Sequence, residues 1–233
     1  MKNSALPKIQ KNFSPLTAGF TLVEVLTVIA IISVLMTAGT IGLGNLTAGK
    51  GTSSAIATCE SLFEEARTIA VSKRCKSRVL IDIADPTNPN YLRRVVIANQ
   101  KINTDGTVDE NNWILSSRGY TMPSGTFFSR EYSKKDPSGK IDEESMTMQS
   151  EAGADMPAYT GNYAVYEFNS EGIFSEPGAS FIIAAGVRPQ KGEPRVSSGA
   201  ERDFAGFVIW RNGRTSSYRS PNQMEIPAKV TTF

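Results

Sequence analysis

The sequence contains no histidine and only two cysteines among its 233 residues. Without histidine, the chain lacks the most common general base and metal ligand, and it cannot form the usual serine-hydrolase triad. The two cysteines, Cys59 and Cys75, fall in one expected helix, where sixteen residues span roughly 24 Å. Bridged Cα atoms lie within about 7 Å of each other, so a disulfide would require that helix to break. We therefore interpret Cys59 as a small apolar packing residue.

The sequence also has no large excess of basic over acidic residues, or of acidic over basic ones. The 25 basic and 23 acidic residues give a net charge of +2, which does not indicate nucleic acid or an acidic partner. The first 19 residues carry Lys2, Lys8 and Lys11 but no acidic residue. By the positive-inside rule this end stays in the cytoplasm, and residues from about 46 onward are placed across the membrane.

No charged residue occurs between Glu24 and Lys50. Residues 20–38 of this stretch are densely apolar, and they come close to the roughly 20 residues that a helix needs to cross a hydrocarbon core. A helix that is apolar all round belongs in lipid or in the centre of a bundle. A carboxylate beside such a segment is costly, which marks Glu24 as functional, and the helix macrodipole favours an anion near the helix start.

Residues 19–24 read Gly-Phe-Thr-Leu-Val-Glu, after a short basic leader and before the apolar run. This pattern resembles the class III signal of type IV pilins and type II secretion pseudopilins. The resemblance implies that a prepilin peptidase cuts between Gly19 and Phe20 and methylates the new N-terminus at Phe20. An ordinary secretory signal places the apolar run before the cut, whereas here the run is retained. The amine of Phe20 would then lie one helical turn from Glu24, on the same chain or a neighbour, and would neutralise it and set the register between subunits.

The rest of the chain begins with an expected flexible joint at residues 47–54, with an N-cap at Ser53 or Ser54. An amphipathic helix of about twenty residues follows and ends near Lys76. Its apolar residues recur at spacings of three and four, and they are Ile56, Cys59, Leu62, Phe63, Ala66, Ile69 and Ala70. This stripe should lie on a sheet.

Several stretches with alternating or β-branched residues predict strands. They are residues 78–84, 94–99, 113–117, 126–129, 163–169, 180–186, 207–210 and 215–219. The Asn212-Gly213 pair between the last two predicts a hairpin. Residues 132–161 are polar with few β-branched side chains and predict a long mobile loop. The tail, residues 221–233, is expected to add an edge strand or to remain loose.

Two clusters of polar and charged residues contain the residue types that are common in binding sites. Asn103, Asp105, Gly106 and Asp109 briefly resemble a calcium loop, but Lys101 and Trp113 stand where ligands are needed, which favours a polar turn. The basic residues Arg202, Arg211, Arg214 and Arg219 lie near Trp210 and Tyr218. Such a strip can bind nucleic acid, but without a basic excess we favour a solvated hairpin and not a nucleic-acid partner.

The later part of the chain supports a narrower resemblance. A helix with Leu62, Ala66, Arg67 and Ala70 before the first strand, a turn at residues 168–172 and a late strand pair around residues 212–214 are similar to H-type minor pseudopilins and FimT-like minor pilins. The resemblance implies an α+β fold in which the N-terminal hydrophobic helix continues into an amphipathic helix packed on an antiparallel sheet. It divides the chain into a leader (1–19), a transmembrane and assembly helix (20–46) and an exported pilin-like head (47–233).

The same resemblance implies a minor structural subunit of a type II secretion pseudopilus, not an enzyme, without cofactor or metal. It would be single-pass in the inner membrane, with the C-terminal head in the periplasm. The implied partners are the prepilin peptidase, other pilin or pseudopilin subunits and the inner membrane. The alternatives are a type IV minor pilin for pilus priming or DNA uptake and, more remotely, a membrane-tethered exported enzyme, which would need a catalytic serine or carboxylate pair in a pocket.

Overall fold

The computed structural model describes residues 21–136, 139–189, 192–196, 203–218, 220–227, 230 and 232–233, and the side chains of residues 34–50 are not described. The chain falls into two compact units, Met1–Leu43 and Gly44–Phe233. Its elements are one long helix, α1 (Leu22–Lys73), followed by short strands and two short 3-10 helices. The fold is therefore α+β with predominantly antiparallel sheets, as the sequence predicted.

The predicted apolar stripe of α1 is confirmed. Its buried members are Ala55, Cys59, Leu62, Phe63, Ala66 and Ala70, and Ile56 and Ile69 pack against them from the edge. The helix ends after Lys73, because Arg74 adopts the left-handed conformation at a φ of 52°. Cys75 therefore lies just past the helix, and both cysteines are buried and free.

The predicted joint at residues 47–54 is wrong, because α1 continues through it without interruption. The backbone stays helical there because the segment is held against the rest of its unit. The side chain of Thr52 is buried, and its hydroxyl donates a hydrogen bond of 2.9 Å to Asp203. A run of Thr, Gly and Ser has weak helix propensity, and this tertiary contact outweighs it.

The larger sheet has six strands in the order β5-β7-β1-β2-β3-β6. They are β1 (Ser77–Asp82), β2 (Arg94–Ile102), β3 (Val108–Thr121), β5 (Glu143–Met146), β6 (Met148–Gln149) and β7 (Gly161–Phe168). All neighbours pair antiparallel except β3 and β6. The central strand β1 pairs with β2 and β7, so strands far apart in the sequence are neighbours.

The smaller sheet has the order β11-β10-β8-β4, and β9 pairs with β8 beside it. Its strands are β4 (Thr126–Phe128), β8 (Ser180–Val187), β9 (Arg195–Val196), β10 (Phe204–Ile209) and β11 (Thr215–Ser217). The predicted hairpin is confirmed, because β10 and β11 pair antiparallel around a turn in which Gly213 has a φ of 75°.

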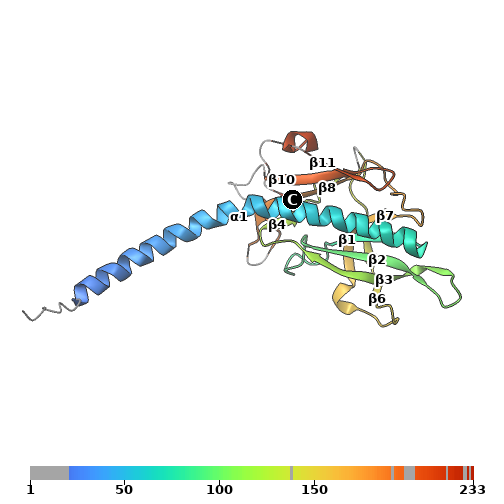
Figure 1. The fold of residues 1–233 in the computed structure, drawn as a ribbon, viewed down its shortest axis with the longest axis horizontal. Coiled ribbons are helices and arrows are strands. Elements are labelled where there is room, and N and C mark those ends of the chain that lie inside the picture. The colour runs from blue at the N-terminus through green and yellow to red at the C-terminus, as the bar shows by residue number, and fades with distance from the viewer. Residues whose placement is uncertain are drawn as a thin grey trace, which may run out of the picture. The chain divides into compact units, whose positions relative to one another are not determined.

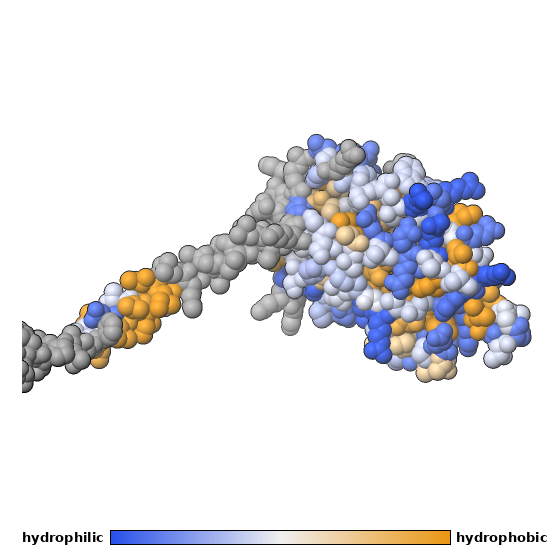
Figure 2. Space-filling view, in the orientation of Figure 1, coloured by the Kyte–Doolittle hydropathy of each residue, from blue (hydrophilic) through white to orange (hydrophobic). Residues whose placement is uncertain are grey.

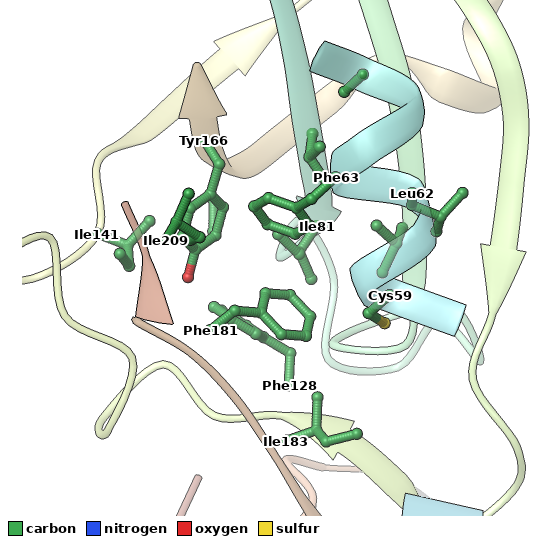
Figure 3. Close-up of a cluster of buried hydrophobic side chains, with 14 of the residues drawn as sticks. Cys59, Leu62, Phe63, Ile81, Phe128, Ile141, Tyr166, Phe181, Ile183 and Ile209 are labelled. Carbon is green, nitrogen blue, oxygen red and sulfur yellow. The ribbon is translucent and has the colours of Figure 1, made fainter. Parts of the chain in front are cut away.

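The main core lies where the C-terminal half of α1 meets both sheets (Figure 1). Figure 3 shows Phe63 pointing from the helix toward Ile81 of the larger sheet and Phe181 of the smaller one. The ring of Phe63 contacts Tyr166 and Phe181 at centroid distances of 5.2 and 5.5 Å. Phe63 of the helix therefore joins aromatic side chains of both sheets in one cluster.

The loop predicted at residues 132–161 is wrong. This segment contains β5, β6 and a 3-10 helix, η1 (Pro157–Tyr159), and it adds a strand to each edge of the larger sheet. Met146 and Met148 are buried with Trp113 and Val165 in a second apolar cluster. The segment is ordered because it covers apolar residues of the sheet that do not contact α1.

The tail also differs from both expected forms. It forms a second 3-10 helix, η2 (Pro221–Met224), and not an edge strand. Met224, Ile226 and Val230 are buried in a third cluster with Ile182 and Ala184 of β8. These contacts hold the described part of the tail on the smaller sheet, so it is not loose.

Candidate processing and assembly site

The first turn of α1 holds the one predicted site residue that the structure describes. The backbone N–H of Glu24 donates a hydrogen bond of 3.3 Å to the hydroxyl oxygen of Thr21, the residue before the helix. Thr21 is thus the N-cap and Glu24 the third helical residue, the Thr-x-x-Glu spacing of a capping box. Sequence reasoning missed this, although residues 21–24 carry the signal in plain form. The cap fixes the start of α1 at Leu22 and leaves the Glu24 side chain exposed in the first turn.

The helix beyond this cap is covered with exposed apolar side chains. Leu22, the most exposed of them, retains 77% of its accessible surface. The others are Val23, Val25, Leu26, Val28, Ile29, Ile31 and Ile32. Figure 2 shows this part of α1 mostly in the hydrophobic colour. Apolar surface at this density marks a site of interaction with protein or lipid.

The hydroxyl groups in the same stretch are satisfied within the helix. Thr27 donates to the carbonyl of Val23 and Ser33 donates to the carbonyl of Ile29, both at 2.8 Å. A hydroxyl bonded to the backbone one turn earlier needs no water. This arrangement therefore suits an apolar environment such as lipid or a helical bundle.

The remaining predicted residues lie outside the described part of the chain. Gly19 and Phe20 are among them, together with the whole leader at residues 1–19, so the cut, the methylation and the pairing of Glu24 with the Phe20 amine stay predictions. The predicted membrane helix, residues 20–46, is described only in part. Over the residues that could be searched, no helix has both the length and the hydropathy of a membrane span.

The comparison with protein families concerns this same end of the chain. Residues 16–40 match the family model of the prokaryotic N-terminal methylation motif. The motif is the class III prepilin signal of type IV pilins and pseudopilins, so the resemblance noted from the sequence is confirmed. It indicates a pilin-like protein that is processed as a prepilin by a prepilin peptidase, assembles with other pilin subunits and is anchored to a membrane by its N-terminus. No curated protein and no solved structure matches the chain.

Of the residues that resemble a calcium loop, Asn103, Asp105 and Gly106 lie in the turn between β2 and β3, and Asp109 lies at the start of β3. Asp105 accepts hydrogen bonds from the hydroxyl and the N–H of Thr107, at 2.6 and 2.9 Å. These bonds hold the pKa of Asp105 below its usual value. In the searched part of the structure, no three His, Cys, Asp or Glu residues are grouped to hold a metal ion. The hydrogen bonds between Asp105 and Thr107 are those of a polar turn, the form that the sequence favoured.

The basic residues near the C-terminus are only partly brought together. Arg211 and Arg214 are exposed in the turn between β10 and β11, next to Trp210, which is 51% exposed. The indole N–H of Trp210 donates to the hydroxyl of Ser216 at 2.8 Å. Tyr218 instead packs against the third apolar cluster, and Arg202 and Arg219 lie outside the described residues. The described members form a solvated hairpin tip, the form that the sequence favoured.

Proposed function

We propose that this chain is a minor structural subunit of a type II secretion pseudopilus. The observation that carries the proposal is the methylation motif at residues 16–40, placed on a helix whose described part exposes apolar side chains on all sides. A single-pass protein of the inner membrane would store this helix in lipid and present residues 47–233 in the periplasm as a pilin-like head.

Assembly would transfer the helix from lipid into a bundle of like helices. Lipid tails are as apolar as these helices, so the hydrophobic effect does not drive the helices together. Their association rests on packing and on polar pairs. Glu24 is the only charged side chain in residues 20–49, so it is the natural partner for a cation on a neighbour. The amine of a processed Phe20 supplies that cation, and the pair would fix the stagger between subunits.

The proposed processing can be tested by intact-mass measurement of protein extracted from membranes. The expected mass is that of residues 20–233 plus one methyl group. A matched sample from cells without prepilin peptidase should retain residues 1–19 and lack the methyl group. A mature chain that begins after residue 38 would contradict the proposal, because it would make the apolar run an ordinary secretory signal.

The assignment to a secretion system requires a separate experiment. Cells that lack this chain should lose type II secretion while keeping surface pili, and the gene supplied in trans should restore secretion. Loss of pili with normal secretion would instead favour the type IV minor pilin. The mass measurement gives the same result in both cases, so the two experiments test different parts of the proposal.

A further inference from the structure

A groove in the unit Gly44–Phe233 contains two arginine side chains. The groove has a volume of about 430 Å³ and lies between the turn before β2, the turn before β4 and the end of β8. Its lining residues include Arg93, Ser124, Phe127 and Arg188. Arg93 and Arg188 come from segments 95 positions apart in the sequence, so only the fold brings them together.

Both guanidinium groups are held in place by backbone carbonyls. Arg93 donates to the carbonyl oxygens of Met122 and Pro89 at distances of 2.5 to 3.2 Å. Arg188 donates to the carbonyls of Asn88 and Tyr91 at 2.5 and 2.6 Å. The Arg188 group also lies 5.5 Å from the centre of the Phe127 ring. Among the described residues, carbonyl oxygens and not carboxylates therefore hold the two cations in place.

The positive charge of this pair is not balanced within the described residues. Four other arginines, Arg67, Arg78, Arg94 and Arg130, each form an ion pair with a carboxylate. Neither Arg93 nor Arg188 forms one with a described residue. The Nε atom of Arg188 is buried and has no hydrogen-bond partner in the described part. Burial lowers the pKa of both arginines, and the charge of Arg93 lowers that of Arg188 further. A pair of repelling cations with free donors is typical of a site for an anion.

We propose that this groove binds a phosphate group. Guanidinium groups match tetrahedral oxyanions in geometry and are weakly hydrated, and two of them supply the charge for a phosphate. Each terminal guanidinium nitrogen carries two N–H donors, so those already bonded to a carbonyl keep a second one.

The phosphate can belong to a lipid headgroup or to free phosphate. The lipid source rests on the proposed storage of residues 20–46 in the membrane. A Cβ added to Gly51 of α1 would lie 3.3 Å from the Thr126 hydroxyl and 3.9 Å from Pro123, in the turn that lines the groove. Gly51 is only five residues past the end of the proposed span, which is roughly 8 Å along a helix. A lipid headgroup is therefore one of the two phosphate sources to test.

The proposal can be tested on the full-length chain in non-ionic detergent. Thermal unfolding is followed while inorganic phosphate replaces chloride at constant ionic strength, so that general screening does not change. The melting temperature should rise with phosphate. Arg188→Gln should weaken the apparent phosphate affinity at least about tenfold, since a charge-assisted pair is lost. Arg214→Gln removes an equal charge from an exposed turn and should leave the affinity unchanged.

Arg188 also holds the turn at residues 88–91, so its replacement could disturb the fold. Ser124→Glu avoids this difficulty, because Ser124 is exposed and lines the groove. The new carboxylate should raise the melting temperature without phosphate and abolish the response to phosphate. Ser124→Gln, of the same size but neutral, should keep the response. An unchanged phosphate response in Ser124→Glu, or no response in the original chain, overturns the proposal.

A second measurement separates the two sources of phosphate. Native mass spectrometry of the chain released from nanodiscs counts the lipids that stay bound, with phosphatidylglycerol or phosphatidylcholine as the only lipid. Retention of phosphatidylglycerol that Ser124→Glu removes assigns the headgroup, and a phosphate response without lipid retention assigns free phosphate. Binding of an acidic peptide without any phosphate response would refute the proposal. If the membrane anchor itself is absent, the phosphate titration still reports on the groove alone.

Discussion

The ring of Phe63 on α1 lies edge-on to the ring of Phe207 on β10, with 5.1 Å between their centroids. Phe63 has no exposed surface, and it makes the same kind of edge contact with Tyr166 on β7 of the other sheet. Edge-to-face ring pairs contribute about 0.5 to 1.5 kcal/mol beyond the burial of their surface. A single side chain thus couples the helix to both sheets, beside the direct contacts that Tyr166 makes with the Phe181 ring and the Ser180 carbonyl of the smaller sheet.

Replacing Phe63 by alanine should therefore destabilise the unit Gly44–Phe233 strongly. We expect a loss of about 3 to 5 kcal/mol in the free energy of unfolding, because the truncation leaves a cavity among four aromatic rings. Urea unfolding followed by circular dichroism measures this. Val71→Ala on the same helix is the control, since Val71 is 49% exposed, and it should cost less than about 1 kcal/mol. Equal losses in the two variants would show that Phe63 does not join the sheets.

The helix and most strands could be predicted because their signals are local. The stripe from Cys59 to Ala70 repeats every three to four residues, and the pattern specifies the buried face before any partner is known. Asn212-Gly213 acts in the same way, because the pair itself favours the hairpin turn. Each of these features was found where the sequence placed it.

The segment of residues 132–161 could not be predicted for the opposite reason. Its buried residues Ile141, Met146 and Met148 are separated by charged and polar positions, and no period links them. They are ordered by apolar partners on other strands, such as Trp113 on β3. Tertiary contact of this kind leaves no local pattern in the sequence.

The candidate sites also differ in whether a local sequence pattern encodes them. The processing motif is a continuous run around Gly19 and Phe20, so the sequence alone contains it. The groove of Arg93 and Arg188 is different, because two isolated arginines carry no signal until the turn before β2 meets the end of β8. Thr21 is an intermediate case, since its spacing from Glu24 was readable but its role depends on where the helix begins.

Replacing Glu24 by valine should leave membrane insertion and cleavage intact but reduce crosslinking to neighbouring subunits. The apolar side chain suits lipid, while the partner of the Phe20 amine is lost. Thr21→Val is the matched control, because it removes the capping hydroxyl and costs about 1 kcal/mol of helix stability while keeping the Glu24 charge. We expect this control to crosslink normally. If both variants lose crosslinking to the same extent, Glu24 acts through the helix cap and not through a pair between subunits.

The unfolding free energy should fall as the pH rises from about 10 to about 12. Burial raises the pKa of Tyr163 to about 12, with a smaller opposing effect of the Arg94 charge. The unfolded chain releases this proton near pH 10, so above that pH it binds fewer protons than the folded chain, which favours unfolding. The contribution is fully present below pH 10, and its loss amounts to at most roughly 3 kcal/mol. Urea titrations at several pH values measure the effect.

Tyr163→Phe serves as the comparison for this pH dependence. The variant loses the hydrogen bond of 2.7 Å from the Tyr163 hydroxyl to the carbonyl of Tyr159, which should cost about 1 kcal/mol at neutral pH. Its unfolding free energy should then fall less steeply above pH 10 than that of the original chain. Identical slopes would mean that other tyrosines or general repulsion cause the alkaline loss.

Replacing Gly119 by alanine should disrupt the pairing of β2 with β3. Gly119 has a φ of 76°, and a Cβ there would lie 1.8 Å from the carbonyl oxygen of Val95 on β2. No rotamer relieves a clash between a Cβ and a backbone atom, so the strands must separate where the register already shifts between Val95 and Ile97.

Gly106→Ala in the same hairpin is the matched control, because its φ is 84° and nothing lies within 4 Å of the added Cβ. The control should lose only the left-handed strain of about 1 to 2 kcal/mol. Gly119→Ala should lose a further ~1 to 3 kcal/mol of unfolding free energy, the typical cost of overpacking. Thermal unfolding of the two variants separates these contributions, and equal losses would show that β2 and β3 absorb the added methyl group without parting.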